Sequence, residues 1–546
     1  TTNTVLGVNA LDANTTGDFN VAVGYEALTT NTSGQYNVAI GRFALASQST
    51  SNFNVGIGLN SLFANTGNDN TAIGAQSLKA NTTGTQNVSV GKDCLFGNTT
   101  GNNNVGVGYQ ALVANTTGGL NTAVGTSALD ANTTGGNNTA IGFESLKSNT
   151  TGHSNNALGS GSLNSNTTGD YNNAVGTGSL GSNTTGDNNT ALGRDALGNN
   201  TTASENTSVG FHALKSNTTG NQQVAIGALA LDANTTGIGN SALGYNALGA
   251  NISGQNNVAI GHSALDANTT TNNNVAIGLH SLGANTGGDN TAVGIWSLKE
   301  NTTGGGNVAV GTYALDANTT ASSNTAVGYY SLSANTTGIS NTAVGANALD
   351  ANTTANYNVA LGYNTLTTNT TGSNNTAIGT SALQNNTTGT RNTAIGRAAM
   401  LNNTVGHRNH ALGQEALSSN TSGAYNVAMG EEALKNNTTA DGNTAFGAHA
   451  AISNTTGGSN TAVGRAALYH NSTGGSNTAI GQAALTNNTA SNNTAVGQAA
   501  LTVNTTGTSL VAVGMKALEQ NTTGSFNIAV GKEALEANTT GGGNIA

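Results

Sequence analysis

Residues 121–137 read NTAVGTSALDANTTGGN, and residues 138–154 read NTAIGFESLKSNTTGHS. The second stretch repeats the first, with Asn, Ala, Gly, Leu and Thr at the same spacing. With Asn121 as position 1 of this repeat, Gly125 is position 5, Leu129 is position 9 and Asn132 is position 12.

The glycine at position 5 recurs 32 times between Gly7 and Gly531, in 28 intervals of 17 residues and three of 16. A short period that fills a chain is typical of solenoids, in which each repeat is one coil stacked on the last. We predict an all-β parallel β-solenoid, or β-roll, of about 32 stacked 17-residue coils, in one continuous array over residues 1–546. Both ends of the sequence fall inside a repeat, so we interpret the chain as a window on a longer fibre.

The composition argues against several classes of protein. The chain has 546 residues, no Pro, 7% charged residues, 14 Lys and Arg in all and a formal net charge of −10. Nucleic-acid binding needs a basic patch, which a chain with so few Lys and Arg and a negative net charge does not supply. The sequence contains no run of 18 apolar residues, so it predicts no membrane span. The single Cys94 stands where other coils have Ala or Ser, which favours a small buried residue over a reactive thiol.

The large apolar residues indicate where the core lies. Position 4 is large and apolar, as in Val23 and Ile40, and position 9 is Leu in 30 of 32 coils. We expect both columns to point inward. Positions 3 and 8 carry only small side chains in nearly every coil, which indicates close packing on a second face. Copies of the chain packed on that face would form a homo-oligomer, most plausibly a trimer, but one chain whose two arcs approach each other would also need small residues there.

Two Asn columns run along the array, at position 1 (Asn121) and position 12 (Asn132). Amides stacked at the spacing of about 4.8 Å between strands can bond to one another and to turn backbone. We interpret Asn121, Gly125, Leu129 and Asn132 as a structural ladder. Asn-Thr-Thr at positions 12–14 is also an N-glycosylation acceptor sequence.

No catalytic or metal-binding pattern is visible. The eight His are scattered over several columns without a paired carboxylate, so we expect no enzyme activity, no metal and no cofactor. Aromatic residues recur at position 17 of three consecutive coils as Phe19, Tyr36 and Phe53. This stripe is either an adhesive patch or a stabilising aromatic ladder.

The motif Asn-x-Ala-Val/Ile-Gly, as in Asn37–Gly41 and Asn257–Gly261, resembles the head repeats of trimeric autotransporter adhesins. It is also similar to the repetitive shafts of tail-fibre proteins from phages and phage-like particles. The resemblance implies a left-handed β-roll with three chains per fibre, outside the cell or on a virion. The extra Asn-Thr-Thr-Gly arc departs from the shorter adhesin repeat.

These observations together favour a structural fibre shaft that contributes to adhesion and lies extracellularly, on a cell surface or on a virion. Its expected partners are further copies of the chain and a host-surface glycan or protein. An alternative is an ice- or surface-binding solenoid that presents Thr and Asn ladders. A third hypothesis is polysaccharide hydrolysis, but the sequence lacks the paired carboxylates in one groove that this reaction uses.

Overall fold

The computed structural model describes residues 2–546 and shows an all-β parallel β-solenoid of about 31 turns with 17-residue coils and no helix among those residues. The predicted fold class is thereby confirmed. The chain divides into two compact units, residues 1–273 and 274–546, and each is described by itself.

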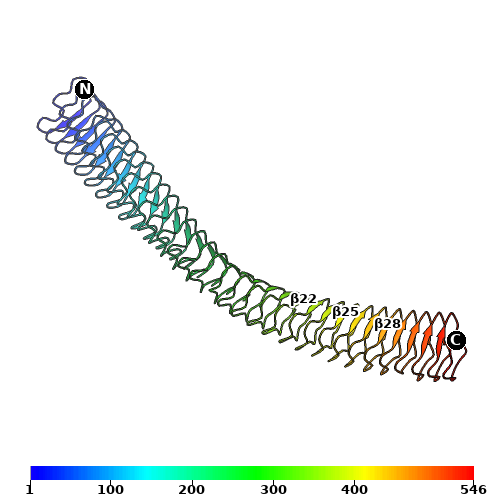
Figure 1. Cartoon of the computed structure of the whole chain (residues 1–546). Coiled ribbons are helices and arrows are strands. Elements are labelled where there is room, and N and C mark those ends of the chain that lie inside the picture. The colour runs from blue at the N-terminus through cyan, green and yellow to red at the C-terminus, as the bar shows by residue number, and fades with distance from the viewer. Residues whose placement is uncertain (1) are drawn as a thin grey trace. The chain divides into compact units, whose positions relative to one another are not determined.

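Each coil contributes one strand of three residues, at positions 2 to 4 of the repeat (Figure 1). The first unit contains β1 (Thr4–Leu6), β2 (Val21–Val23), β3 (Val38–Ile40), β4 (Val55–Ile57), β5 (Thr71–Ile73), β6 (Val88–Val90), β7 (Val105–Val107), β8 (Thr122–Val124), β9 (Thr139–Ile141), β10 (Asn156–Leu158), β11 (Asn173–Val175), β12 (Thr190–Leu192), β13 (Thr207–Val209), β14 (Val224–Ile226), β15 (Ser241–Leu243) and β16 (Val258–Ile260). The second unit contains β17 (Val275–Ile277), β18 (Thr291–Val293), β19 (Val308–Val310), β20 (Thr325–Val327), β21 (Thr342–Val344), β22 (Val359–Leu361), β23 (Thr376–Ile378), β24 (Thr393–Ile395), β25 (His410–Leu412), β26 (Val427–Met429), β27 (Thr444–Phe446), β28 (Thr461–Val463), β29 (Thr478–Ile480), β30 (Thr494–Val496), β31 (Val511–Val513) and β32 (Ile528–Val530).

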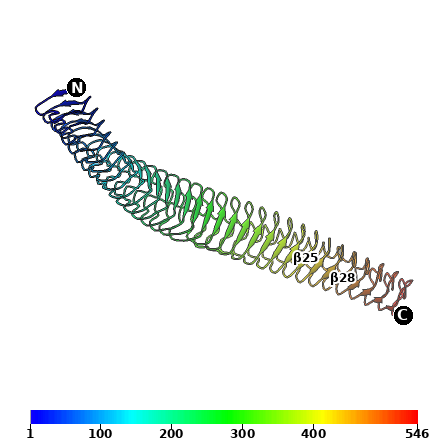
Figure 2. The same cartoon turned by 90° about the horizontal axis from the view of Figure 1, so that it is seen from above.

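Successive strands within each unit pair in parallel and in register (Figure 2). Thr122, Ala123 and Val124 of β8, for example, pair with Thr139, Ala140 and Ile141 of β9. Each strand residue therefore stacks on the residue at the same position of the next coil. The three 16-residue coils keep this register, as in the pairing of β4 with β5, because the missing residue is lost from the turn.

The strand faces are the reverse of those predicted from the sequence. Ala123 and Ala140 at position 3 have no exposed surface, whereas Ile141 at position 4 is 38% exposed. The prediction that position 4 points into the core was therefore wrong. A three-residue strand sends positions 2 and 4 to one face and position 3 to the other, and the small residue faces the interior here.

The second arc brings two neighbouring residues into the core. Ala128 at position 8 and Leu129 at position 9 are both fully buried. Residues at positions 7 and 9 have positive φ, 55° at Ser127 and 53° at Leu129, so this arc is not a strand and its side chains do not alternate. The left-handed conformation is costly for residues other than Gly. Backbone bonds between coils offset that cost, such as Leu129 N–H to the Ser145 carbonyl at 3.0 Å.

The interior of one chain therefore consists of Ala at position 3, a small residue at position 8 and Leu at position 9. Both small columns face the interior of the same chain, so the small residues are not the surface on which copies of the chain would pack. The approach of the two arcs within one chain accounts for the small residues in both columns.

Glycine at position 5 is required for two reasons. Gly125 has φ of +137°, a region that side chains rarely adopt, and a Cβ there would lie 2.4 Å from the Gly142 carbonyl oxygen. At position 15 a Cβ on Gly135 would also crowd the next coil, but its φ is not positive. Ala203 and Ala355 occupy that position in other coils. The difference explains why only the first glycine column is invariant.

We predict that a charge in the Leu column unfolds coils locally. Leu231→Asp places a carboxylate at a fully buried site and should lower the local unfolding free energy by about 4 kcal/mol or more. Hydrogen–deuterium exchange should show lost protection over residues 206–256. Leu231→Met is the matched control, since Met400 occupies the same column, and should cost less than about 1.5 kcal/mol. Equal protection in both variants would contradict the core assignment.

Candidate functional site

The two Asn columns meet at a backbone carbonyl of the turn. Asn121 Nδ2 donates to the Gly135 carbonyl at 2.9 Å, and Asn132 Nδ2 donates to the same oxygen at 3.0 Å. Each column also links successive coils: the Asn138 N–H donates to Asn121 Oδ1 at 3.0 Å, and Asn149 Nδ2 donates to Asn132 Oδ1 at 2.9 Å. These side chains are fully buried and hold the turn against the core.

The burial of the Asn132 amide affects whether the Asn-Thr-Thr sequence can be glycosylated. Asn132 Nδ2 is the atom to which an N-linked glycan would attach, and it donates to Asn115 Oδ1 at 2.8 Å as well as to Gly135. A glycan there would displace one of these bonds and would have no room beneath the turn. The folded coil therefore does not present Asn132 as an acceptor.

The aromatic stripe predicted from position 17 is a stack of rings. Phe19 and Tyr36 have ring centroids 4.9 Å apart and Tyr36 and Phe53 have centroids 5.1 Å apart, with nearly parallel planes. All three residues have positive φ near 59° and are about half exposed. The rings cover each other's faces, so the stripe presents mainly ring edges to solvent.

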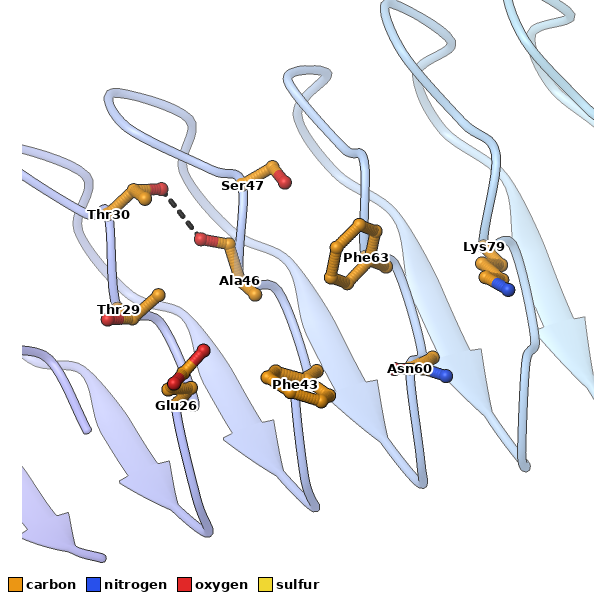
Figure 3. A pocket seen from close by; sticks show the side chains of 9 residues that line it. All are labelled: Glu26, Thr29, Thr30, Phe43, Ala46, Ser47, Asn60, Phe63 and Lys79. Atoms are coloured by element: carbon orange, nitrogen blue, oxygen red, sulfur yellow. Dashed lines mark hydrogen bonds between the residues drawn. The ribbon is translucent and has the colours of Figure 1, made fainter. Parts of the chain in front are cut away.

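A surface groove lies in the first unit, on the outside of the second arc (Figure 3). It has a volume of about 480 Å³, and its lining residues come from positions 7, 10 and 11 of neighbouring coils: Glu26, Thr29, Thr30, Phe43, Ala46, Ser47, Asn60, Phe63 and Lys79. The small side chain of Ala46 leaves space on its coil, and beside it Phe43 of the same coil and Phe63 of the next meet edge to face, with ring centroids 6.3 Å apart.

Two cations flank the groove without an acidic partner. The Arg42 guanidinium lies 4.7 Å from the centre of the Phe43 ring, and Lys79 Nζ lies 5.3 Å from that of Phe96. In the described chain neither cation has a carboxylate within 4.0 Å, although eight other Lys and Arg do: Lys92, Lys147, Arg194, Lys299, Arg397, Lys435, Lys516 and Lys532. The groove thus offers aromatic surface together with cations free to meet an anionic group.

The largest feature that sequence reasoning missed is the outward face of the strands. We call the side chains at positions 2 and 4 of all strands the outer sheet face. Position 4 is Val, Ile, Leu, Met or Phe throughout, and its side chains reach 48% exposure at Leu158 and 53% at Phe446. No Asp, Glu, Lys or Arg lies in any strand from β1 to β32. The signal available in the sequence was the strict smallness of position 3, which only an enclosed face requires.

Cys94 is buried, as predicted, and loss of solvation raises the pKa of its thiol to about 11. A Cβ on Gly106 in the next coil would lie 2.6 Å from Cys94 Sγ, so the glycine makes room for the larger sulfur atom. Cys94 is a packing residue in this structure.

Residues 2–546 contain no group of three or more His, Cys, Asp and Glu side chains placed to hold a metal ion. Nor does the described part of the chain contain a helix with the length and apolar character needed to cross a membrane. No known family model matches the sequence, and no curated protein matches it significantly.

We predict a pH dependence from Asp316, which is half-buried at position 10 in the second unit. Burial raises the pKa of this carboxyl to about 6, against the opposing effects of two backbone amides and Lys299. The folded state therefore holds the proton more tightly than the unfolded state, and Asp316 makes the fold less stable as pH rises from about 4 to about 6.

Asp316→Asn removes this titration, and Asn164 already occupies the same position in another coil. The variant should match the wild-type melting temperature at pH 4 and exceed it at pH 7, as measured by circular dichroism. A constant difference across that range would contradict the raised pKa.

Proposed function

We propose that the chain is the structural shaft of a fibre on a cell surface or virion, with a mechanical rather than a catalytic role. The observation that carries the proposal is that successive coils bond to one another through the same backbone atoms along the stack. The strand, the second arc and the two Asn columns all contribute such bonds, and Leu510 is the one position-1 residue without a side-chain amide. Such a stack resists extension at every step and can be lengthened by adding coils.

Self-association belongs to the same proposal. The resemblance to adhesin heads and tail-fibre shafts favours a left-handed roll with three chains per fibre. The exposed apolar residues of the outer sheet face support association, because soluble monomers rarely leave apolar patches of that extent in contact with water.

Attachment is the second part of the role. The groove beside Phe43 and Phe63, with Arg42 and Lys79 at its margins, is the best-formed candidate contact for a host-surface glycan or protein. The stacked stripe of Phe19, Tyr36 and Phe53 is less suited to stacking against a ligand, since its ring faces are already covered. We therefore assign attachment to the groove.

The alternative, an ice- or surface-binding solenoid, depended on free Thr hydroxyls in regular columns. At position 13 the Thr133 hydroxyl donates to the Thr150 carbonyl at 3.1 Å, and the same bond recurs along the array. At position 14, the second Thr column of this alternative, Val405 interrupts the row and the three 16-residue coils lack a residue in the turn. Neither column presents an uninterrupted row of hydroxyl donors, which favours the shaft.

Immunogold electron microscopy tests the shaft directly. Antibodies raised against the purified chain should label thin filaments along their length on the surface of the producing cells or particles. Label confined to the cell interior, with no labelled filament, would contradict the proposal. Antibodies against an unrelated soluble protein of the same source provide the control.

A further inference from the structure

We infer that the outer sheet face is the surface through which one copy of the chain binds another, with Phe446 of one copy entering a hollow on the strands β24–β26 of the other. This inference deepens the proposed assembly of the shaft by naming the surface and its central contact.

The size of the outer sheet face suits such an interface. Each unit carries 16 strands, which at about 4.8 Å per strand and about 3.3 Å per residue give a face of roughly 750 Å². Each partner of a standard interface buries about 800 Å². One unit is thus already of the right size, and the chain has two.

The composition of the surface resembles that of an interface. Its centre, at positions 2 and 4, is free of Asp, Glu, Lys and Arg. The flank at position 6 instead carries Arg and aromatic residues, the types that dominate binding energy at protein contacts: Arg42, Arg194, Arg397, Arg465, Tyr25, Tyr109, Tyr245, Tyr329, Tyr363, Phe143 and Phe211. Four of the six arginines of the chain stand in this one column.

A second copy is the partner that matches the spacing of this face. The side chains at position 4 form a row that repeats once per strand. A partner must offer ridges of the same period over the whole length, and the chain itself does. The absence of charge in the centre gives no basis for recognition of an acidic or basic partner.

The face also carries one protrusion and one hollow. Phe446 on β27 is the largest side chain in its column and is 53% exposed. A hollow of about 210 Å³ lies nearby, lined by Thr393, Ile395, His410, Ala411, Leu412 and Met429. Every one of these residues belongs to β24, β25 or β26. Each copy therefore carries both the protruding Phe446 and a hollow to receive the Phe446 of a partner. This arrangement is compatible with a two-fold symmetric pair and with a closed ring of copies.

Sedimentation equilibrium on the full chain tests the inference. Wild type should associate, and Phe446→Ala should raise its dissociation constant about tenfold or more, as expected when an aromatic anchor is lost. Val405→Ala is the control, since Val405 is 49% exposed but lies at position 14, in the turn between the second arc and the next strand. It should leave the dissociation constant unchanged.

A second variant tests the whole face. Val310→Lys, Leu361→Lys, Leu412→Lys and Val513→Lys together place four cations on non-adjacent strands and should raise the dissociation constant at least a hundredfold. The control carries Thr320→Lys, Thr371→Lys, Ser422→Lys and Thr523→Lys, which are exposed turn positions of the same coils. Circular dichroism verifies that both variants keep the β-solenoid spectrum.

A monomeric wild type, or a four-lysine face variant that assembles as tightly as wild type, would overturn the inference. If the four-lysine variant dissociates but Phe446→Ala has no effect, the outer sheet face remains the interface and the contact between Phe446 and the hollow is overturned. A monomeric wild type would also overturn the self-association included in the proposed function, whereas filaments labelled by immunogold would still support the mechanical shaft, so the shaft and the interface fail separately.

Discussion

The structure depends on the close approach of each coil to the next. Successive coils are joined by backbone bonds in the strand, in the second arc and in the turn, such as the Thr122 N–H to the Asn138 carbonyl at 2.8 Å. A residue that keeps two coils apart at any point would break several of these bonds at once. The requirement explains the glycine at position 5, where a Cβ would meet the backbone of the next coil. It also explains the buried Asn columns, since an amide can both accept from one coil and donate to another.

The same approach makes the interior narrow. Leu at position 9 is the only large side chain that enters it in most coils, and Ala at position 3 faces it from the strand. A second large residue opposite Leu would overfill the space. The large apolar residues of the strand are therefore turned outward, where they leave a surface for association. In this fold the thin core and the apolar exterior are two consequences of one constraint.

Much of this could be predicted from the sequence. The period of Gly and Leu specified the parallel in-register stack, and the positions of the three deletions located the turn. Alternation separated Ala123 from Thr122 and Val124 but could not tell which face was inside. The usual assumption that large apolar residues are buried then gave the wrong answer. The positive φ at Ser127 and Leu129, which lets Ala128 and Leu129 share the core, has no sequence signature that strand alternation would reveal. The groove at Ala46 was also hidden, because it arises from neighbours in different coils.

The orientation of the strand decides which residues form the core, and one pair of variants distinguishes the two possible orientations. Ala174 on β11 is fully buried and its neighbour Val175 is 38% exposed. The thermal unfolding of Ala174→Asp and Val175→Asp is measured at low protein concentration. We expect Val175→Asp to keep the wild-type melting temperature within a few degrees and Ala174→Asp to unfold the surrounding coils at much lower temperature. The reverse order of stability would show that the large residues face inward and would contradict this account.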